Sequence, residues 1–212
     1  MTNPAPPLAP DVIGSIEQLE ALLGPVGEAS LKKEADHLHP LYRQWIEASP
    51  FAVLATAGPG GLDASPRGDP AGLVDVLDEK TLLLPERRGN NRADSLRNIL
   101  VDPRVGLLFL IPGVGETLRV NGRATISIAP DLLRRLAIHE QAPKFVLVIH
   151  VESVYFHCAR AIQRSGLWNA RTDVAAPTVP SAGAMLAALT KDAIDGAAYD
   201  RELPGRQRAT LY

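Results

Sequence analysis

Six or more strand-like segments follow one another between Phe51 and Tyr155, and this run constrains the fold more than any other feature. Turn signals separate the segments about every 8–12 residues, which is typical of antiparallel sheets. The sequence therefore predicts a mainly β fold with α-helices, in which the strands form a closed or nearly closed antiparallel barrel. Short helices expected at 94–100 and 131–138 would cap this barrel. The expected strands are 51–56, 62–67, 72–77, 80–84, 105–111, 117–128 and 145–155.

Helical patterns precede and follow the barrel segment. Asp11 is expected to cap a helix that ends at Gly24-Pro25, and a second helix is expected at 34–48 with an interruption at Pro40. A linker after the barrel leads to one further expected helix at 181–198. The chain is thus expected to comprise a helical arm at 1–48, a barrel domain at 49–168 and a C-terminal linker and helix at 169–212.

Composition excludes several classes of protein. The chain has 212 residues, is 46% hydrophobic and carries a formal charge of −2, so it can bury a full core and has no general attraction for nucleic acid. Cys158 is the single cysteine, which excludes an internal disulfide framework and indicates a reducing, cytoplasmic location. No apolar run approaches the roughly 20 residues that span a bilayer, and the proline-rich N-terminus does not have the pattern of a signal peptide.

A dense group of basic and polar residues covers the junction of an expected strand and an expected helix. The segment 87–97 contains four arginines, one glycine and two asparagines. Guanidinium groups bind phosphate oxygens bidentately, and a helix N-terminus adds free N–H groups and a favourable dipole. The segment therefore predicts a site for a phosphate-bearing ligand.

Two further groups of polar residues allow both a structural and a functional interpretation. Arg67 lies between Pro66 and Gly68, where it is expected either to form a rim ion pair with Asp69 or Asp63, or to bind the same phosphate or a flat ring. Alternation along 117–128 places Arg119, Asn121 and Arg123 on one strand face, which is expected to meet solvent or an interface.

The segment after the last strand offers no metal site. His157 and Cys158 are adjacent, and adjacent strand residues point to opposite faces, so they are not expected to share a metal ion. Cys158 is expected to be a small buried residue, whereas Arg164 and Trp168 could stack on a planar ligand. No phosphate-binding loop of the GxxxxGK[ST] type and no nucleophile-elbow, zinc-protease or Cys-x-x-Cys motif is present, which favours chemistry carried by a cofactor.

Taken together, these segments give the chain a resemblance to a known family. It resembles the pyridoxamine 5′-phosphate oxidase-like, FMN-binding split-barrel flavoproteins, in particular a bacterial FMN-dependent subgroup. The matching segments run in order from Phe51 to Trp168 and are 49–56, 65–72, 84–92, 94–100, 111–124, 156–159 and 164–168. The resemblance implies a six-stranded split barrel that forms a homodimer, with two FMN sites at the dimer interface.

The resemblance also implies how the first strands and the arginine-rich segment meet the cofactor. Arg67, Asn91 and Arg92 are expected to bind the flavin phosphate. Ser65 and Pro66 are expected to lie along the edge of the isoalloxazine ring. Loss of the Arg92 side chain should weaken FMN binding by a few kcal/mol, as for a charge-assisted phosphate contact.

The remaining expected contacts come from later segments and from the second subunit. Leu84 and Pro85 are expected to supply backbone contacts to the ring, and Thr117 a polar side chain from the partner subunit. Arg164 and Trp168 are expected to approach the flavin from the C-terminal segment. No residue is assigned a catalytic role, because flavin chemistry needs no protein nucleophile.

The function implied is that of an FMN-dependent oxidoreductase that transfers hydride at flavin N5 to or from a small organic substrate. The Arg-x-His element that binds the substrate phosphate in pyridoxamine phosphate oxidases is missing from the C-terminal segment 203–212, so vitamin B6 oxidation is not expected. Two alternatives remain open. One is a flavin-binding or redox-sensing protein without turnover, and the other is a reductase that uses deazaflavin F420 on the same fold.

Overall fold

The structure is a computed structural model that describes residues 11–89, 91–169 and 179–209. The proline-rich N-terminal segment 1–10, Asn90, and residues 170–178 of the expected linker lie outside the described residues. The chain divides into two units, residues 1–34 and residues 35–212. The division expected from the sequence, at 48 and 168, stays a prediction.

The first unit contains two short helices, α1 (Ile16–Leu23) and α2 (Glu28–Lys32). Ser15 caps α1, because its side chain accepts a hydrogen bond of 3.2 Å from the backbone N–H of Gln18. The expected cap at Asp11 was therefore wrong: a serine close to the first helical turn reaches these N–H groups. Gly24, with φ of 72°, ends the helix as expected.

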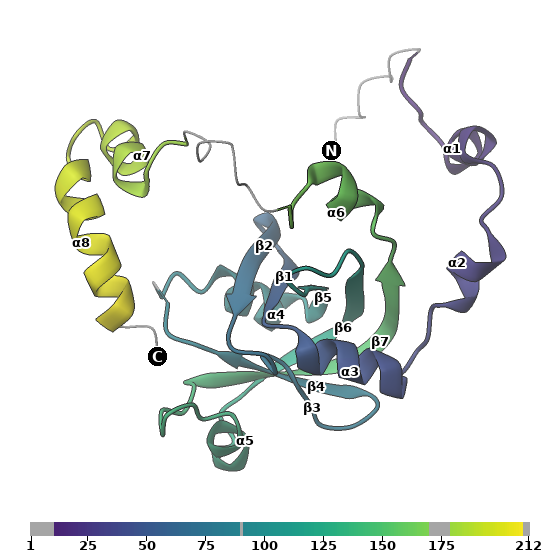
Figure 1. Cartoon of the computed structure of the whole chain (residues 1–212), viewed down its shortest axis with the longest axis horizontal. Coiled ribbons are helices and arrows are strands. Elements are labelled where there is room, and N and C mark those ends of the chain that lie inside the picture. The colour runs from purple at the N-terminus through teal and green to yellow at the C-terminus, as the bar shows by residue number, and fades with distance from the viewer. Residues whose placement is uncertain (1–10, 90, 170–178, 210–212) are drawn as a thin grey trace, which may run out of the picture. The chain divides into compact units, whose positions relative to one another are not determined.

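The second unit is built on one antiparallel sheet of seven strands with the order β2-β1-β5-β6-β7-β4-β3 (Figure 1). The strands are β1 (Phe51–Gly58), β2 (Gly61–Gly68), β3 (Asp75–Val76), β4 (Thr81–Glu86), β5 (Arg104–Leu110), β6 (Thr117–Ser127) and β7 (Phe145–His157). The expected mainly β split barrel with flanking helices is confirmed. The sheet has the seven strands expected from the sequence pattern, one more than the six that the resemblance implies, because the two-residue β3 extends it beyond β4.

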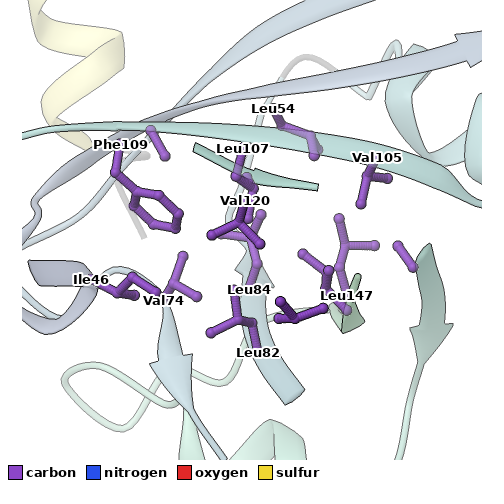
Figure 2. Packing of buried hydrophobic residues seen from close by; sticks show 14 of the residues in the cluster. Ile46, Leu54, Val74, Leu82, Leu84, Val105, Leu107, Phe109, Val120 and Leu147 are labelled. Carbon is purple, nitrogen blue, oxygen red and sulfur yellow. The ribbon is translucent and has the colours of Figure 1, made fainter. Parts of the chain in front are cut away.

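The core lies inside the curve of this sheet. Leu54, Leu107, Val120, Leu147 and Leu84 come from β1, β5, β6, β7 and β4, and each is at most 1% exposed (Figure 2). These strands occupy the second to sixth positions of the sheet, yet their side chains form one cluster. A flat sheet cannot bring side chains of such distant strands together, so the sheet curls around its own apolar face.

Short helices pack against the curled sheet. They are α3 (Pro40–Ala48), α4 (Asp94–Val101) and α5 (Pro130–Arg135), and a further short helix, α6 (Arg160–Ser165), follows β7. α3 begins at Pro40, where the sequence indicated an interruption, because proline suits the first turn of a helix. Ile46 of α3 and Ile99 of α4 join the core cluster, and α4 packs mainly on β1. These contacts fix the first turn of α4 beside the barrel.

The C-terminal region forms two helices, α7 (Ala182–Leu189) and α8 (Gly196–Ala209). The single helix expected at 181–198 was therefore wrong. A Cβ atom added at Gly183 would lie 2.0 Å from the carbonyl oxygen of Gly196, so the two helices cross at a contact between backbones. Asp200 of α8 also accepts a hydrogen bond of 2.7 Å from the backbone N–H of Gly183. Sequence periodicity does not report such a crossing.

Among the described residues, no helix is long and apolar enough to cross a membrane.

Candidate functional site

A cleft of about 500 Å³ opens where β2, the end of β4 and the first turn of α4 meet. This volume lies in the range of small-molecule sites. The residues that line it are Asp63, Ser65, Pro66, Arg67, Gly68, Leu73, Pro85, Glu86, Arg87, Arg88, Gly89, Arg92, Ala93, Asp94, Ser95 and Leu96.

Curling of the sheet creates the cleft. Four strands separate β2 from β4 in the sheet order, so no backbone ladder joins them. Their side chains meet nonetheless, since Arg67 of β2 and Glu86 of β4 form an ion pair with 3.3 Å between Nε and Oε2. The cleft is thus part of the split that the open barrel leaves between these two strands.

Arg67 is held in the cleft by contacts on two sides. Its Nη1 donates hydrogen bonds to Ser65 Oγ at 3.0 Å and to the carbonyl oxygen of Pro66 at 2.9 Å. Its Nε faces Glu86 Oε2, but the geometry is not that of a hydrogen bond and both atoms are buried. Burial raises the pKa of Glu86 above its ordinary value, and the charge of Arg67 opposes that shift. The partner of Arg67 is therefore neither Asp63 nor Asp69.

A chain of hydroxyl groups continues from Arg67 to the helix. Ser95 Oγ donates to Asp63 Oδ2 at 2.7 Å, and Ser65 Oγ lies 2.9 Å from Ser95 Oγ. Ser95 has a single hydroxyl proton, which goes to Asp63, so Ser65 donates to Ser95. Each group in the chain thus donates to the next: Arg67 to Ser65, Ser65 to Ser95, and Ser95 to Asp63. Sequence reasoning missed Ser95, although its place in the first turn of the expected helix, within the arginine-rich segment, could have indicated it.

The N-terminus of α4 faces the same cleft. The residue at its N-cap position is Ala93, and no side chain there accepts a hydrogen bond from the first turn. Asn91 and Ala93 have φ values of 60° and 56°, a left-handed conformation that non-glycine residues rarely adopt. An N-terminus without a side-chain cap presents N–H groups and a positive dipole end, both of which favour an anion.

The four arginines of the arginine-rich segment differ in their contacts and exposure. Arg87 donates to Asp69 Oδ2 at 2.7 Å and to the carbonyl oxygen of Leu136 at 2.9 Å, and its side chain is 16% exposed. Arg92 is 78% exposed and pairs with Asp94 at 2.5 Å. Arg88 is exposed and lines the cleft, whereas Arg97 does not line it. Arg87 thus ties two segments together, and Arg88 and Arg92 are the more exposed cations.

Half of the ten expected cofactor contacts lie together. Those that line the cleft are Ser65, Pro66, Arg67, Pro85 and Arg92. Leu84, the neighbour of Pro85, is fully buried in the core. Asn91 lines an adjacent cavity of about 330 Å³ that also includes Arg88 and Lys144.

Thr117, Arg164 and Trp168 do not line the cleft. Thr117 begins β6 and Arg164 lies in the last turn of α6. Trp168 donates a hydrogen bond of 2.7 Å from Nε1 to the carbonyl oxygen of Val114. The expected contacts, of Thr117 with the flavin of a partner subunit and of Arg164 and Trp168 with the flavin from the C-terminal segment, stay predictions.

The end of β7 differs from the sequence expectation at one residue. Cys158 is exposed, so the expectation of a small buried residue was wrong. β7 ends at His157, and beyond that residue the alternation of a strand no longer decides which side chains are buried. Among the residues described, no group of three or more His, Cys, Asp or Glu side chains could hold a metal ion.

Comparison with known proteins gives a match over the barrel. The model of the family described as pyridoxamine 5′-phosphate oxidase matches residues 38–158. No curated protein matches the chain.

Several solved structures are similar. HupZ from Group A Streptococcus is 20% identical, covers 53% of this chain and 87% of its own, and has a TM-score of 0.43. General Stress Protein 26 from Bacillus anthracis is 17% identical, with 53% and 88% covered and a TM-score of 0.42. A Clostridium acetobutylicum protein of the pyridoxinephosphate oxidase family, related to general stress protein 26, is 13% identical, with 54% and 84% covered and a TM-score of 0.42.

Proposed function

This chain belongs to the pyridoxamine 5′-phosphate oxidase family, and we propose that it binds FMN in the cleft between β2, β4 and α4 and acts as an oxidoreductase on a small organic substrate. One observation carries the proposal: a largely buried arginine, two hydroxyl groups and a helix N-terminus without a side-chain cap converge on one cleft. This set of donors fits a phosphate monoester.

The phosphate would lie against the first turn of α4. Arg67 and Arg92 supply charge, while Ser65 and Ser95 supply hydroxyl groups that can donate or accept. The three carboxylates of the cleft, Asp63, Glu86 and Asp94, already engage Ser95, Arg67 and Arg92 respectively. The two arginines that would bind the phosphate are therefore each paired with a carboxylate of the cleft.

The ring of the flavin would extend from this end along β2 and β4. Pro66 and Pro85 offer rigid apolar surface there. The backbone groups of Leu84 and Pro85 are expected to meet the ring. When bound, FMN supplies hydride transfer at N5. The chain's own part is to bind the cofactor, to orient it and to hold positive charge near it.

A homodimer completes this proposal. Phe51, Leu62 and Phe156 are 37%, 91% and 40% exposed, and apolar side chains of that size in contact with water favour an interface. Thr117 would then reach the flavin of the partner subunit, and Arg164 and Trp168 would approach the flavin from the C-terminal segment. We place the dimer in the cytoplasm, where the exposed thiol of Cys158 stays reduced.

The test is the visible spectrum of the purified protein, followed by mass analysis of any released cofactor. FMN at about one molecule per chain, and bleaching by NADH or NADPH, would support the proposed oxidoreductase. FMN that no nicotinamide donor reduces would favour a redox sensor or carrier. Uptake of F420 without uptake of FMN would favour a deazaflavin reductase, and binding of neither would refute the proposal.

A further inference from the structure

Among the described residues that line the cleft, Glu86 is the carboxylate that forms an ion pair with the largely buried Arg67. Its carboxylate lies on the same guanidinium that the proposed phosphate would use, with Oε2 at 3.3 Å from Arg67 Nε. Both side chains are largely buried, with Glu86 23% and Arg67 14% exposed. An anionic ligand and Glu86 therefore cannot both use the Nε edge of Arg67.

We propose that Glu86 is an internal competitor of the ligand phosphate for Arg67, and thereby sets how tightly the cleft binds an anionic cofactor. The inference rests on the proposed function, since it assumes that the phosphate lies at Arg67. It assigns Glu86 a part in setting affinity, although nothing in the sequence pattern distinguished this residue.

The geometry of the pair indicates that Glu86 competes with the phosphate for Arg67 and does not orient the Arg67 side chain. A carboxylate that orients an arginine does so through short, aligned hydrogen bonds. Here Nε and Oε2 are buried and neither takes part in a hydrogen bond. Arg67 is instead oriented by Ser65 Oγ and the carbonyl oxygen of Pro66, both bound through Nη1. Removal of the Glu86 charge would therefore leave the guanidinium in place and free its Nε edge.

Burial adds to this effect. The pKa of Glu86 is raised by desolvation, which means that its charged form is poorly stabilised where it lies. A phosphate that bound Arg67 would have to move this buried negative charge aside or bind beside it. Like charges at such a partly buried site repel each other more strongly than they do in water, so the carboxylate weakens phosphate binding.

The test is a double-mutant cycle on FMN affinity, measured by equilibrium dialysis and by flavin fluorescence. Glu86→Gln keeps the size of the side chain and should tighten FMN binding about tenfold. The same substitution in an Arg67→Ala background should tighten binding much less, because no guanidinium is left to compete for. Glu152→Gln, which removes an equal charge from the half-exposed pair with Arg123, is the matched control and should leave FMN affinity unchanged.

Each other result overturns the inference in a distinct way. Weaker binding by Glu86→Gln would mean that Glu86 orients Arg67, and equal tightening in both backgrounds would mean simple repulsion without competition. Glu86→Met removes the same charge and replaces Glu86→Gln in the cycle if that variant does not fold. Absence of FMN binding in the wild type and in every variant would refute the proposed function itself.

Discussion

Arg87 Nε lies 2.7 Å from Asp69 Oδ2, and the two side chains are 16% and 3% exposed. Asp69 directly follows β2, the first strand in the sheet order, and Arg87 directly follows β4, the sixth. Together with the pair of Arg67 and Glu86, this contact joins the two sides of the split barrel where no backbone ladder does. Side-chain ion pairs thus take the place of strand pairing at the split.

Asp69→Ala should lower the free energy of unfolding by about 3 kcal/mol, because it leaves the charge of Arg87 buried without its partner. Chemical denaturation measures the change. Glu152→Ala is the control: its pair with Arg123 is half exposed and contributes less than about 1 kcal/mol. Equal losses in the two variants would contradict a structural role for the pair across the split.

Arg67→Ala should weaken FMN binding about thirtyfold or more, because a largely buried cation that contacts a phosphate is removed. Arg92→Ala should weaken it about tenfold or less, below the sequence-based expectation, since Arg92 is 78% exposed and already paired with Asp94. Fluorescence titration gives both values. Arg104→Ala, outside the cleft, should have no effect, and a larger loss at Arg92 than at Arg67 would place the phosphate elsewhere.

Gly122→Ala should lower the free energy of unfolding by at least about 2 kcal/mol. The added Cβ would lie 2.1 Å from the carbonyl oxygen of His150, and the register of β6 and β7 shifts between Asn121 and Gly122. Thermal unfolding of the variant measures the loss. Gly60→Ala is the control, because no atom lies within 4 Å of its added Cβ. An unchanged melting temperature for Gly122→Ala would speak against this close approach of the two strands.

Asp102 should titrate with a pKa of about 2, because Arg104 donates hydrogen bonds to its carboxylate. A pKa below the unfolded value means that the ionised carboxylate stabilises the folded state above pH 3.8, and that this contribution disappears as pH falls towards about 2. NMR titration of the carboxyl carbon measures the pKa directly. Arg104→Ala should return it towards 3.8, and an unshifted value in the wild type would contradict the contact.

The contribution of Glu86 to stability should depend on pH in the direction opposite to that of Asp102. Burial raises its pKa, so the folded protein binds this proton more tightly than the unfolded chain does. The contribution is fully present below pH 4.5 and is lost as pH rises through the raised pKa. Denaturation of Glu86→Gln and of the wild type over a pH series should therefore show the variant gaining relative stability as pH rises. A constant difference would mean that Arg67 fully offsets the burial.

Local patterns predicted most of the strands. Alternation from Thr117 to Ser127 buries Leu118, Val120 and Ala124, because the side-chain period of a strand depends only on neighbouring residues. The strand expected at 72–77 is reduced to Asp75–Val76, the two residues that form a ladder with β4, and Leu77 adds one backbone hydrogen bond of 3.0 Å to the carbonyl oxygen of Thr81. The length of an edge strand depends on the strand with which it pairs, and a single segment of sequence does not specify that partner.

The sequence by itself determined that the chain makes an antiparallel barrel and that its arginine-rich segment begins a helix, because both depend on local periodicity and turn residues. Only the tertiary structure decided which residues share the cleft. Arg67 meets Glu86 rather than Asp69 or Asp63, and Ser95 meets Ser65, because curling of the sheet brings β2, β4 and α4 together. The distance between unpaired strands follows from the closure of the whole core, which no local pattern encodes.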